Sequence, residues 1–266
     1  MSTIPPRGFV NTGNICYFSA LVQCLLSSAF FVRYVSVREE CRDLLFDNFF
    51  EDIQRRGKWD EYFTTRLLET MPGGKLPNQS SSEYLLLLIE RMHMDPLFEY
   101  VHLVRSTCIS CGHISETTDK STLLLLTNNM LEFFEHSETI EGVSCDKCHN
   151  KDGIKQDRFL RSIPPLIAVS LNKYFEKTQF YYPPYFKIDV PSGRTFEGHK
   201  SPEENNVIEY TLVATLDHSG VLGGGHYVAR VKRQHATFLI SDSTIIEIPE
   251  LNCVDSSYML FYERKQ

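Results

Sequence analysis

Apolar residues recur with helical spacing in two stretches of the first hundred residues. Both stretches place them at positions i, i+3, i+4 and i+7, which is one face of an amphipathic helix. The two faces consist of Phe18, Leu21, Val22 and Leu25, and of Leu85, Leu88, Ile89 and Met92. The pattern predicts a helix starting near Cys16 and a second one after residues 80–82, and we expect residues up to about 98 to be mostly helical.

Beyond residue 160 the period changes from helical to alternating. Apolar residues then alternate with smaller or polar ones, as expected for strands. The two clearest runs are Ile167, Val169 and Leu171, and Tyr210, Leu212, Ala214 and Leu216. A helical first part followed by a mainly antiparallel second part predicts the α+β class, and the 266 residues suffice for a single domain with a sizeable core.

Cys16 stands where a turn-rich lead-in, residues 8–14, gives way to the first predicted helix. Gly13 supplies the turn and Asn14 is the predicted cap. A thiol at a helix N-terminus has a lowered pKa, because the unpaired N–H groups and the macrodipole favour the thiolate. Cys16 is therefore a candidate nucleophile, and the alternative is a buried structural cysteine.

His226 is the candidate partner of Cys16. It follows the glycines at 223–225 and precedes an alternating run that predicts a strand. The two residues are 226 − 16 = 210 positions apart, which suits a nucleophile and base that meet only in the fold. A long hairpin loop with a structural histidine is the alternative, but the presence of both residues favours a catalytic pair.

Two C-x-x-C pairs predict a metal site. Cys108, Cys111, Cys145 and Cys148 supply four thiolates, the ligands that structural zinc binds tetrahedrally. The gap of 145 − 111 − 1 = 33 residues between the pairs is longer than the common zinc-ribbon spacing. His113 and His149 lie close by as substitute ligands. We expect one structural Zn²⁺, since four protein ligands leave no open position for water.

Charge and hydropathy narrow the choice of partners and compartment. The net charge of −7 makes nucleic acid and anionic membranes poor general partners, whereas a basic partner fits. The N-terminus has no apolar signal core and no run reaches the length of a membrane span. We expect an intracellular monomer, cytoplasmic and/or nuclear, whose paired cysteines bind metal and do not form disulfides.

Four ordered blocks of sequence then point to a known family. Residues 11–17 read N-T-G-N-I-C-Y, close to the pattern N-x-G-N-T-C-Y, and residues 79–85 are similar to Q-D-A-x-E-F. The remaining blocks are 108–113 with 145–148, and 225–229 with 240–243 and 258–262. Together they resemble the ubiquitin-specific proteases, which are papain-like deubiquitinases built as thumb, palm and fingers. The resemblance covers nearly the whole chain and implies a helical thumb over about 1–98, with antiparallel palm and zinc-bearing fingers over about 99–266.

The resemblance implies a role for each matching residue. Cys16 would attack the carbonyl of the terminal glycine of ubiquitin, His226 would serve as the base, and Asn11 would help to form the oxyanion hole. His218 and Tyr227 would lie beside the channel for the ubiquitin tail. The implied partners are ubiquitin or ubiquitinated proteins, and the implied chemistry needs no organic cofactor.

Ser241 and Asp242 compete for the third catalytic position. The histidine base needs an acceptor that orients it and stabilises the imidazolium. Most family members have Asp or Asn where this chain has Ser241, and a minority have serine. Neighbouring strand residues face opposite sides, so both can reach His226 only if a bulge or turn intervenes. Ser241 is favoured slightly over Asp242.

Glu83 has two interpretations that the sequence leaves open. The family uses this acidic residue to contact the ubiquitin tail, but Ser80 to Glu83 also reads S-x-x-E, the capping box of a helix start. Ser80 replaces the family's aspartate, which predicts weaker or altered tail recognition. This loss, together with Ile15 in place of threonine, leaves two alternatives: a protease for another ubiquitin-like modifier, or a weakly active or inactive ubiquitin-binding relative.

Overall fold

The computed structural model describes residues 4–11, 13–37, 50, 61–70, 80–126, 134–171, 182–190, 206–221 and 224–266. Within these residues the helices precede the strands. The helices are α1 (Cys16–Leu25), α2 (Ala29–Val37), α4 (Glu61–Thr70), α5 (Ser81–Arg91) and α6 (Asp95–Phe98). The strands are β1 (Tyr100–Cys108), β2 (Ile114–Ser121), β3 (Leu124–Leu126), β4 (Glu135–Ile140), β5 (Ile154–Ser162), β6 (Leu166–Leu171), β7 (Tyr185–Val190), β8 (Asn206–Val221), β9 (Gly224–Arg233), β10 (Ala236–Ser241), β11 (Thr244–Ile248) and β12 (Ser257–Arg264).

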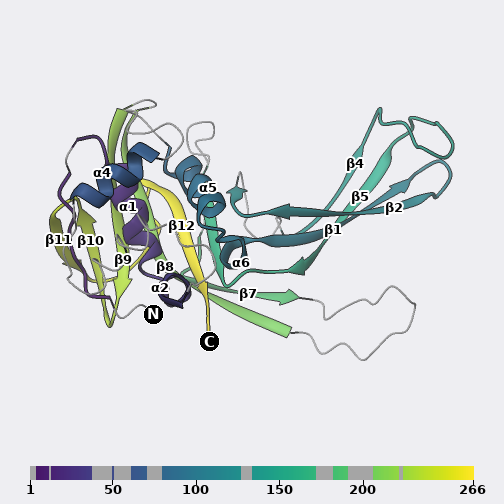
Figure 1. Cartoon of the computed structure of the whole chain (residues 1–266). Helices are drawn as coiled ribbons and strands as arrows, with labels where there is room; N and C mark the ends of the chain where they lie inside the picture. Colours follow the sequence, from purple (N-terminus) through teal and green to yellow (C-terminus); the bar gives the residue numbers. More distant parts are fainter. Residues whose placement is uncertain are drawn as a thin grey trace.

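Two sheets organise the molecule (Figure 1). The larger sheet has the order β11-β10-β9-β8-β12-β6-β3, with β7 also paired to β8. The smaller sheet, ordered β2-β1-β5-β4, projects from it as a long arm. We call the larger sheet the palm, the arm the fingers, and the helices beside the palm the thumb. The described strands pair antiparallel except β3 with β6, which confirms the α+β class.

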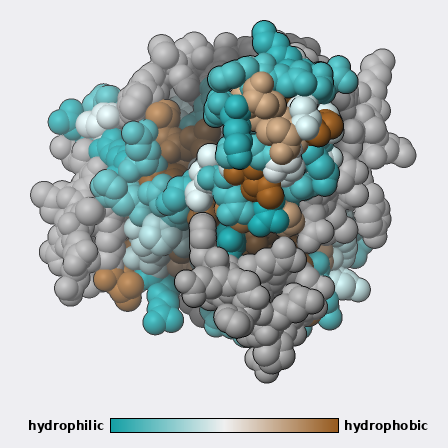
Figure 2. Space-filling model, turned by 90° about the vertical axis from the view of Figure 1, so that its right-hand side faces the viewer, coloured by the Kyte–Doolittle hydropathy of each residue, from teal (hydrophilic) through white to brown (hydrophobic). Residues whose placement is uncertain are grey.

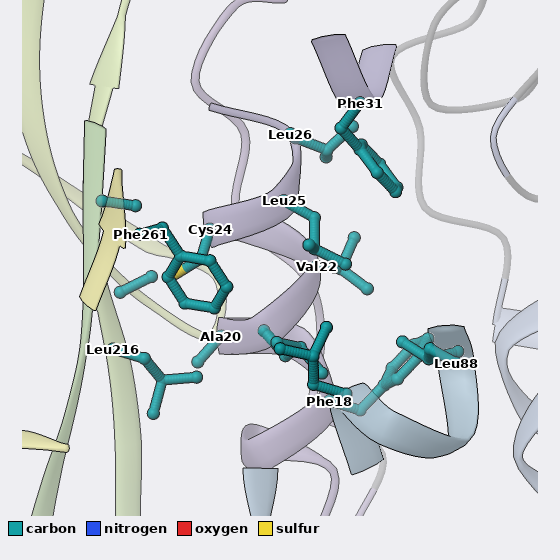
Figure 3. Packing of buried hydrophobic residues seen from close by; sticks show 14 of the residues in the cluster. Phe18, Ala20, Val22, Cys24, Leu25, Leu26, Phe31, Leu88, Leu216 and Phe261 are labelled. Atoms are coloured by element: carbon teal, nitrogen blue, oxygen red, sulfur yellow. The ribbon is translucent and has the colours of Figure 1, made fainter. Parts of the chain in front are cut away.

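Helix α1 lies at the centre of the thumb, and every residue from Tyr17 to Leu25 is buried. A helix that is buried along its length must be covered on all sides, its polar residues Ser19 and Gln23 included. Figure 3 shows how: Cys24 points toward Phe261 of the palm, while Phe18 points toward Leu88 of α5. The helix predicted from the apolar spacing is confirmed. No single helix in the described part of the chain is long and apolar enough to cross a membrane, and α1 with α2 qualifies only as a pair bent by 94°.

The palm is covered on both faces, which explains why β6 is buried along its whole length. Ala168 faces the cluster that contains α1, whereas Ile167 and Val169 belong to a second cluster on the opposite side. Stacked and edge-to-face rings fill that second cluster, with Phe186 5.3 Å from Tyr210 between ring centroids. The predicted strands at 167–171 and 210–216 are confirmed, and the palm lies between two apolar layers.

The fingers, by contrast, have little apolar core. Most of β2 is exposed, and along β5 Leu160 is the single buried side chain. Ion pairs link the strands: Arg105 of β1 pairs with Glu116 of the neighbouring β2 at 2.7 Å, and Arg158 of β5 reaches across β1 to Asp119 of β2 at 2.9 Å. The face on the fingertip side of the molecule is largely hydrophilic among the described residues, with separate apolar patches (Figure 2). This arm therefore depends on its strand ladders and on its tip for order.

Candidate active site and metal centre

Cys16 is the first residue of α1, as the sequence predicts. The loop before it turns sharply, with φ of 122° at Gly13 and 51° at Asn14. The predicted cap is wrong, because Ile15 occupies the N-cap position and no side chain caps the helix. Asn14 adopts the left-handed turn conformation that asparagine tolerates. The Cys16 side chain is half-buried, so a reactant can reach it.

Asn11 is held by hydrogen bonds on both sides of its amide. Its Oδ1 accepts from the backbone N–H of Gly13 at 3.0 Å and of Ile15 at 3.4 Å. Its Nδ2 donates to Asp242 Oδ2 at 3.2 Å. These contacts fix which way the amide points, so the N–H groups of Asn11 face the β10–β11 turn.

His226 lies near the start of β9, opposite Ser219 of β8. Its Nε2 is 2.9 Å from Ser241 Oγ and 3.9 Å from Asp242 Oδ2. Ser241 ends β10 and pairs with Thr244, which leaves Asp242 in the tight turn to β11 with φ of 49°. A turn therefore does intervene, and both competing residues lie on the His226 side.

Asp242 contacts both the segment before Cys16 and the strand that carries His226. Its Oδ2 lies between Asn11 and His226, and its backbone oxygen accepts from Phe9 N–H at 2.8 Å. Gly8 packs against the same turn so closely that a Cβ there would lie 2.5 Å from the carbonyl carbon of Ser243. Helix α1 in turn packs on β8, β9 and β10. The segment leading to Cys16 and the strand carrying His226 thus share one site.

A cluster of aromatic and hydroxyl groups lies beside this site. The ring of His218 is 4.4 Å from that of Tyr227, and the Tyr227 ring is 5.9 Å from that of Tyr258. Gly225 lies next to them without room for a side chain, because a Cβ there would be 2.5 Å from the backbone oxygen of Ser219 and 2.4 Å from His218 Nε2. Burial and the neighbouring His226 lower the pKa of His218, which keeps it neutral at physiological pH.

Tyr258 connects this palm cluster to the thumb. Its hydroxyl lies 2.8 Å from Ser80 Oγ and 3.2 Å from Ser82 Oγ. The capping box expected from the sequence does not form, because the Ser80 side chain makes no cap hydrogen bond. Glu83 is exposed in the first turn of α5, and Gln79 of the same block lies outside the described residues. Sequence reasoning did not single out Tyr258, although it belongs to one of the four blocks.

The four cysteines of the C-x-x-C pairs meet at the tip of the fingers, with their sulfur atoms within 4.8 Å of one another. Cys108 Sγ lies 3.7 Å from Cys148 Sγ, and Cys111 Sγ lies 3.8 Å from Cys145 Sγ. These separations are far beyond a disulfide bond of about 2.05 Å. The four thiols can hold one metal ion, and neither His113 nor His149 belongs to this group.

The two cysteine pairs sit in turns of the same design. Gly112 donates its N–H to Cys108 O at 2.9 Å, and His149 donates its N–H to Cys145 O at 2.8 Å. Both donors have positive φ, 69° for Gly112 and 59° for His149. His149 thus serves as a turn residue, and its imidazole lies outside the group of four cysteines.

A thiol at the start of a helix, with an imidazole on the sheet that the helix packs against, is typical of cysteine hydrolases. The sequence model of the family described as "Ubiquitin carboxyl-terminal hydrolase" matches residues 7–262. The chain therefore belongs to the ubiquitin carboxyl-terminal hydrolase family.

Individual relatives agree with this assignment. The probable ubiquitin carboxyl-terminal hydrolase 8 of Schizosaccharomyces pombe is 28% identical over 299 residues, which cover 98% of this chain and 65% of that protein. The mouse ubiquitin carboxyl-terminal hydrolase 17-like protein C is 23% identical, over 97% of this chain and 54% of its own length. The chain thus spans less than two thirds of either relative.

Solved structures agree on the fold. The SAGA Ubp8/Sgf11/Sus1/Sgf73 DUB module bound to ubiquitin aldehyde contains a chain with a TM-score of 0.75 and 18% identity. The alignment covers 99% of this chain and 70% of that one. At this identity the likeness concerns the fold, and it extends over thumb, palm and fingers alike.

Proposed function

We propose that the chain is a deubiquitinating thiol protease that hydrolyses the peptide or isopeptide bond after the C-terminal glycine of ubiquitin. The observation that carries the proposal is the meeting, at the β10–β11 turn, of the segment leading to Cys16 with the strand that bears His226. In a chain of this family, that meeting supports an active site built from both ends of the sequence.

The proposed mechanism is acyl transfer. With Nε2 of His226 hydrogen-bonded to Ser241, Nδ1 is left to take the proton of Cys16. The thiolate attacks the glycine carbonyl, the imidazolium protonates the departing amine, and a water activated by His226 hydrolyses the thioester. No organic cofactor takes part in these steps.

Asn11 is the proposed side-chain donor to the oxyanion. A primary amide has two N–H groups, and among the described residues Asp242 engages Nδ2. The second N–H of Nδ2 is then available to the developing negative charge, which forms while the amide is already oriented. Asp242 thereby acts on the oxyanion site as well as on the base.

Ser241 is the proposed third member of the triad. Its hydroxyl is at hydrogen-bond distance from Nε2, whereas the nearest Asp242 oxygen is 3.9 Å away. A neutral hydroxyl orients the ring but stabilises imidazolium less than a carboxylate does. The negative charge of Asp242, 3.9 Å from Nε2, supplies part of the stabilisation of imidazolium that the hydroxyl does not.

The metal we propose is a single structural Zn²⁺ bound by Cys108, Cys111, Cys145 and Cys148. Four sulfurs at about 2.3 Å from a tetrahedral ion stand about 3.8 Å apart, and two sulfur pairs here stand 3.7 and 3.8 Å apart. Such a set holds the two turns of the fingertip together and leaves no position for catalytic water. Zinc thiolates also suit the reducing, intracellular location, cytoplasmic and/or nuclear, that we propose.

Substrate recognition is proposed to fall to Glu83, His218 and Tyr227. Glu83 is exposed on α5 and can reach a basic tail, while the rings of His218 and Tyr227 form an apolar wall. Ser80, at the position of the aspartate in the family's pattern, contributes only a hydroxyl that is bound to Tyr258. This neutral contact, in place of a charged one, favours a second candidate function: a protease for another ubiquitin-like modifier.

The test compares turnover of C-terminal fluorogenic amides of ubiquitin and of other ubiquitin-like modifiers at equal concentrations. We expect ubiquitin amide to be hydrolysed fastest and His226→Ala to lose at least about 10³-fold in kcat. Preferred hydrolysis of another modifier would establish the second candidate. A folded protein that hydrolyses none of these amides would contradict both.

A further inference from the structure

Arg233, the last residue of β9, is buried beneath the end of helix α1 with 1% of its surface exposed. Among the described residues no carboxylate forms an ion pair with it. Burial lowers the pKa of its guanidinium to about 9, so it remains charged at neutral pH. A buried cation without a counter-ion costs free energy, and such a residue calls for a specific set of partners.

The partners lie in the last turn of α1. The carbonyl oxygens of Val22, Cys24 and Leu25 accept from backbone N–H groups beyond the helix. Arg233 donates to the remaining carbonyl, that of Gln23, at 2.5 Å, and the Ser27 hydroxyl donates to the same oxygen at 3.2 Å. A cation among the last carbonyl groups of a helix is favourable, because these carry the negative end of the macrodipole.

The same guanidinium fixes the side chain of Gln23. Nη2 of Arg233 donates to Gln23 Oε1 at 3.3 Å, so the amide nitrogen of Gln23 must point away from the guanidinium. That nitrogen donates to the backbone oxygen of Arg7 at 2.5 Å. The reversed amide would set two N–H donors against each other and leave the Arg7 carbonyl without this partner.

Arg7 begins the short segment that ends at Asn11. After Arg7, the segment is fixed to the β10–β11 turn by the tight packing of Gly8 on Ser243 and by the hydrogen bond from Phe9 N–H to Asp242 O. The thumb therefore holds the segment at Arg7 through Gln23, and the palm holds the residues that follow, up to Asn11. An oxyanion donor must be placed to within a fraction of an ångström, so both attachments bear on Asn11.

We propose that Arg233 and Gln23 are positioning residues for the oxyanion site: the buried guanidinium orients the Gln23 amide, and the amide holds the segment that carries Asn11. The inference rests on the proposed function for the catalytic role of Asn11. Neither residue touches the substrate, and both act through the backbone between residues 7 and 11.

Gln23→Glu is the decisive variant. The carboxylate keeps a partner for Arg233, so the fold is retained, but it cannot donate to the Arg7 carbonyl. Ser27→Ala is the matched control, because it removes another hydrogen-bond partner of the Arg233 guanidinium and a second donor to the Gln23 carbonyl, but leaves the bond from the Gln23 amide to Arg7 in place. The first readout is amide hydrogen exchange of the unliganded protein, which does not depend on activity.

We expect Gln23→Glu to speed exchange of the Phe9 amide about tenfold or more, and Ser27→Ala to change it less than about twofold. For ubiquitin fluorogenic amide, Gln23→Glu should lower kcat about ten- to a hundredfold with KM within about twofold. Alkylation of Cys16 by iodoacetamide, which forms no oxyanion, should stay within about twofold. In an Asn11→Ala background the kcat loss should vanish.

Three outcomes separate the possibilities. Unchanged Phe9 exchange in a folded Gln23→Glu protein would overturn the inference. A kcat loss that persists in full in the Asn11→Ala background would also overturn it, since the residue would then act elsewhere. A wild-type protein that is inert toward ubiquitin would defeat the proposed function, and Phe9 exchange would still decide whether Gln23 positions the segment.

Discussion

The palm with its thumb and the fingers are ordered by different means. In the palm, β6 is buried along its whole length and α1 is covered on all sides. In the fingers, β2 is mostly exposed and cross-strand ion pairs replace a core. Exposed ion pairs contribute only about 0–1 kcal/mol each. The comparison teaches that the region around Cys16 and His226 is stabilised by apolar packing between distant segments, whereas the fingers depend on a local cluster of thiols.

Removing the proposed metal should affect the fingers far more than the palm. Chelation, or Cys111→Ser with Cys148→Ser, takes away the ligand bonds that join the two tip turns. We expect amide protection at the tip ends of β1, β2 and β5 to fall by about 10³-fold or more, which is roughly 4 kcal/mol of local stability. Protection within α1 and β6 should stay unchanged. Hydrogen exchange with and without chelator measures both regions at once.

Equal loss of protection in fingers and palm would contradict the separation between the two regions. Cys253→Ser is the control variant, because Cys253 is half-buried and lies outside the cysteine cluster. It should leave the metal content at one ion per chain.

Ser241→Ala should lower kcat about ten- to a hundredfold, because it removes a hydrogen bond that orients the base. Asp242→Ala should cost less, and its loss should largely disappear in an Asn11→Ala background, since Asp242 Oδ2 accepts from Asn11. Both variants leave the apolar cores intact and should unfold at the wild-type denaturant midpoint. The measurement is the steady-state kinetics of Ser241→Ala, Asp242→Ala, Asn11→Ala and the double variant of Asn11 and Asp242.

The opposite ranking would show this assignment to be wrong. If Asp242→Ala abolishes turnover while Ser241→Ala is mild, the carboxylate orients His226. In that case Ser241 only closes β10.

His102 should make the fingers sensitive to mild acid. Burial, and to a smaller extent Arg158, lower the pKa of His102, while Asp119 opposes them. The unfolded chain then takes up a proton near pH 6.5, before the folded chain does. Stability is therefore full above that pH and falls as the pH drops below it, by at most about 1.4 kcal/mol per pH unit for one group.

His102→Gln should remove this part of the acid sensitivity. Denaturant unfolding at pH 7.5, 6.5 and 5.5 gives the free energy of unfolding of both proteins. The acid sensitivity of the thiols is the same in both, so it cancels in the difference between variant and wild type. Identical pH slopes for the two proteins would mean that His102 is not the group responsible.

Local patterns predicted the local structures well. The apolar spacing located α1 and α5, and the C-x-x-C spacing identified four residues whose sulfurs do meet. These features depend on residues a few positions apart, or on a chemical type that has few other uses.

Features that depend on docking of distant segments were not predictable in the same way. Ser80 satisfied the capping-box pattern, but its hydroxyl binds Tyr258 instead, because Tyr258 of β12 lies beside the start of α5 in the fold. Asn14 was a plausible cap, yet the sharp turn before Cys16 takes it out of position. The contact between Asn11 and Asp242 spans 231 positions, and no spacing rule reveals it.

The proposed pairing of Cys16 with His226 rests on two steps. Either residue alone is compatible with a structural role, their joint presence favours a catalytic pair, and the four ordered blocks add a family in which such a pair is expected. Arg233 shows the remaining gap: an arginine at a strand end normally lies in solvent, and only the packed structure reveals that it is buried beneath α1.

Covalent labelling tests the central claim most directly, namely that Cys16 is the nucleophile of a deubiquitinase. The protein is incubated with ubiquitin that carries a C-terminal electrophile, and the adduct is mapped by mass spectrometry. The account predicts one ubiquitin per chain, attached at Cys16 and absent in Cys16→Ser, with no adduct on the fingertip cysteines. A well-folded protein that acquires no ubiquitin, or acquires it at another cysteine, would contradict the account.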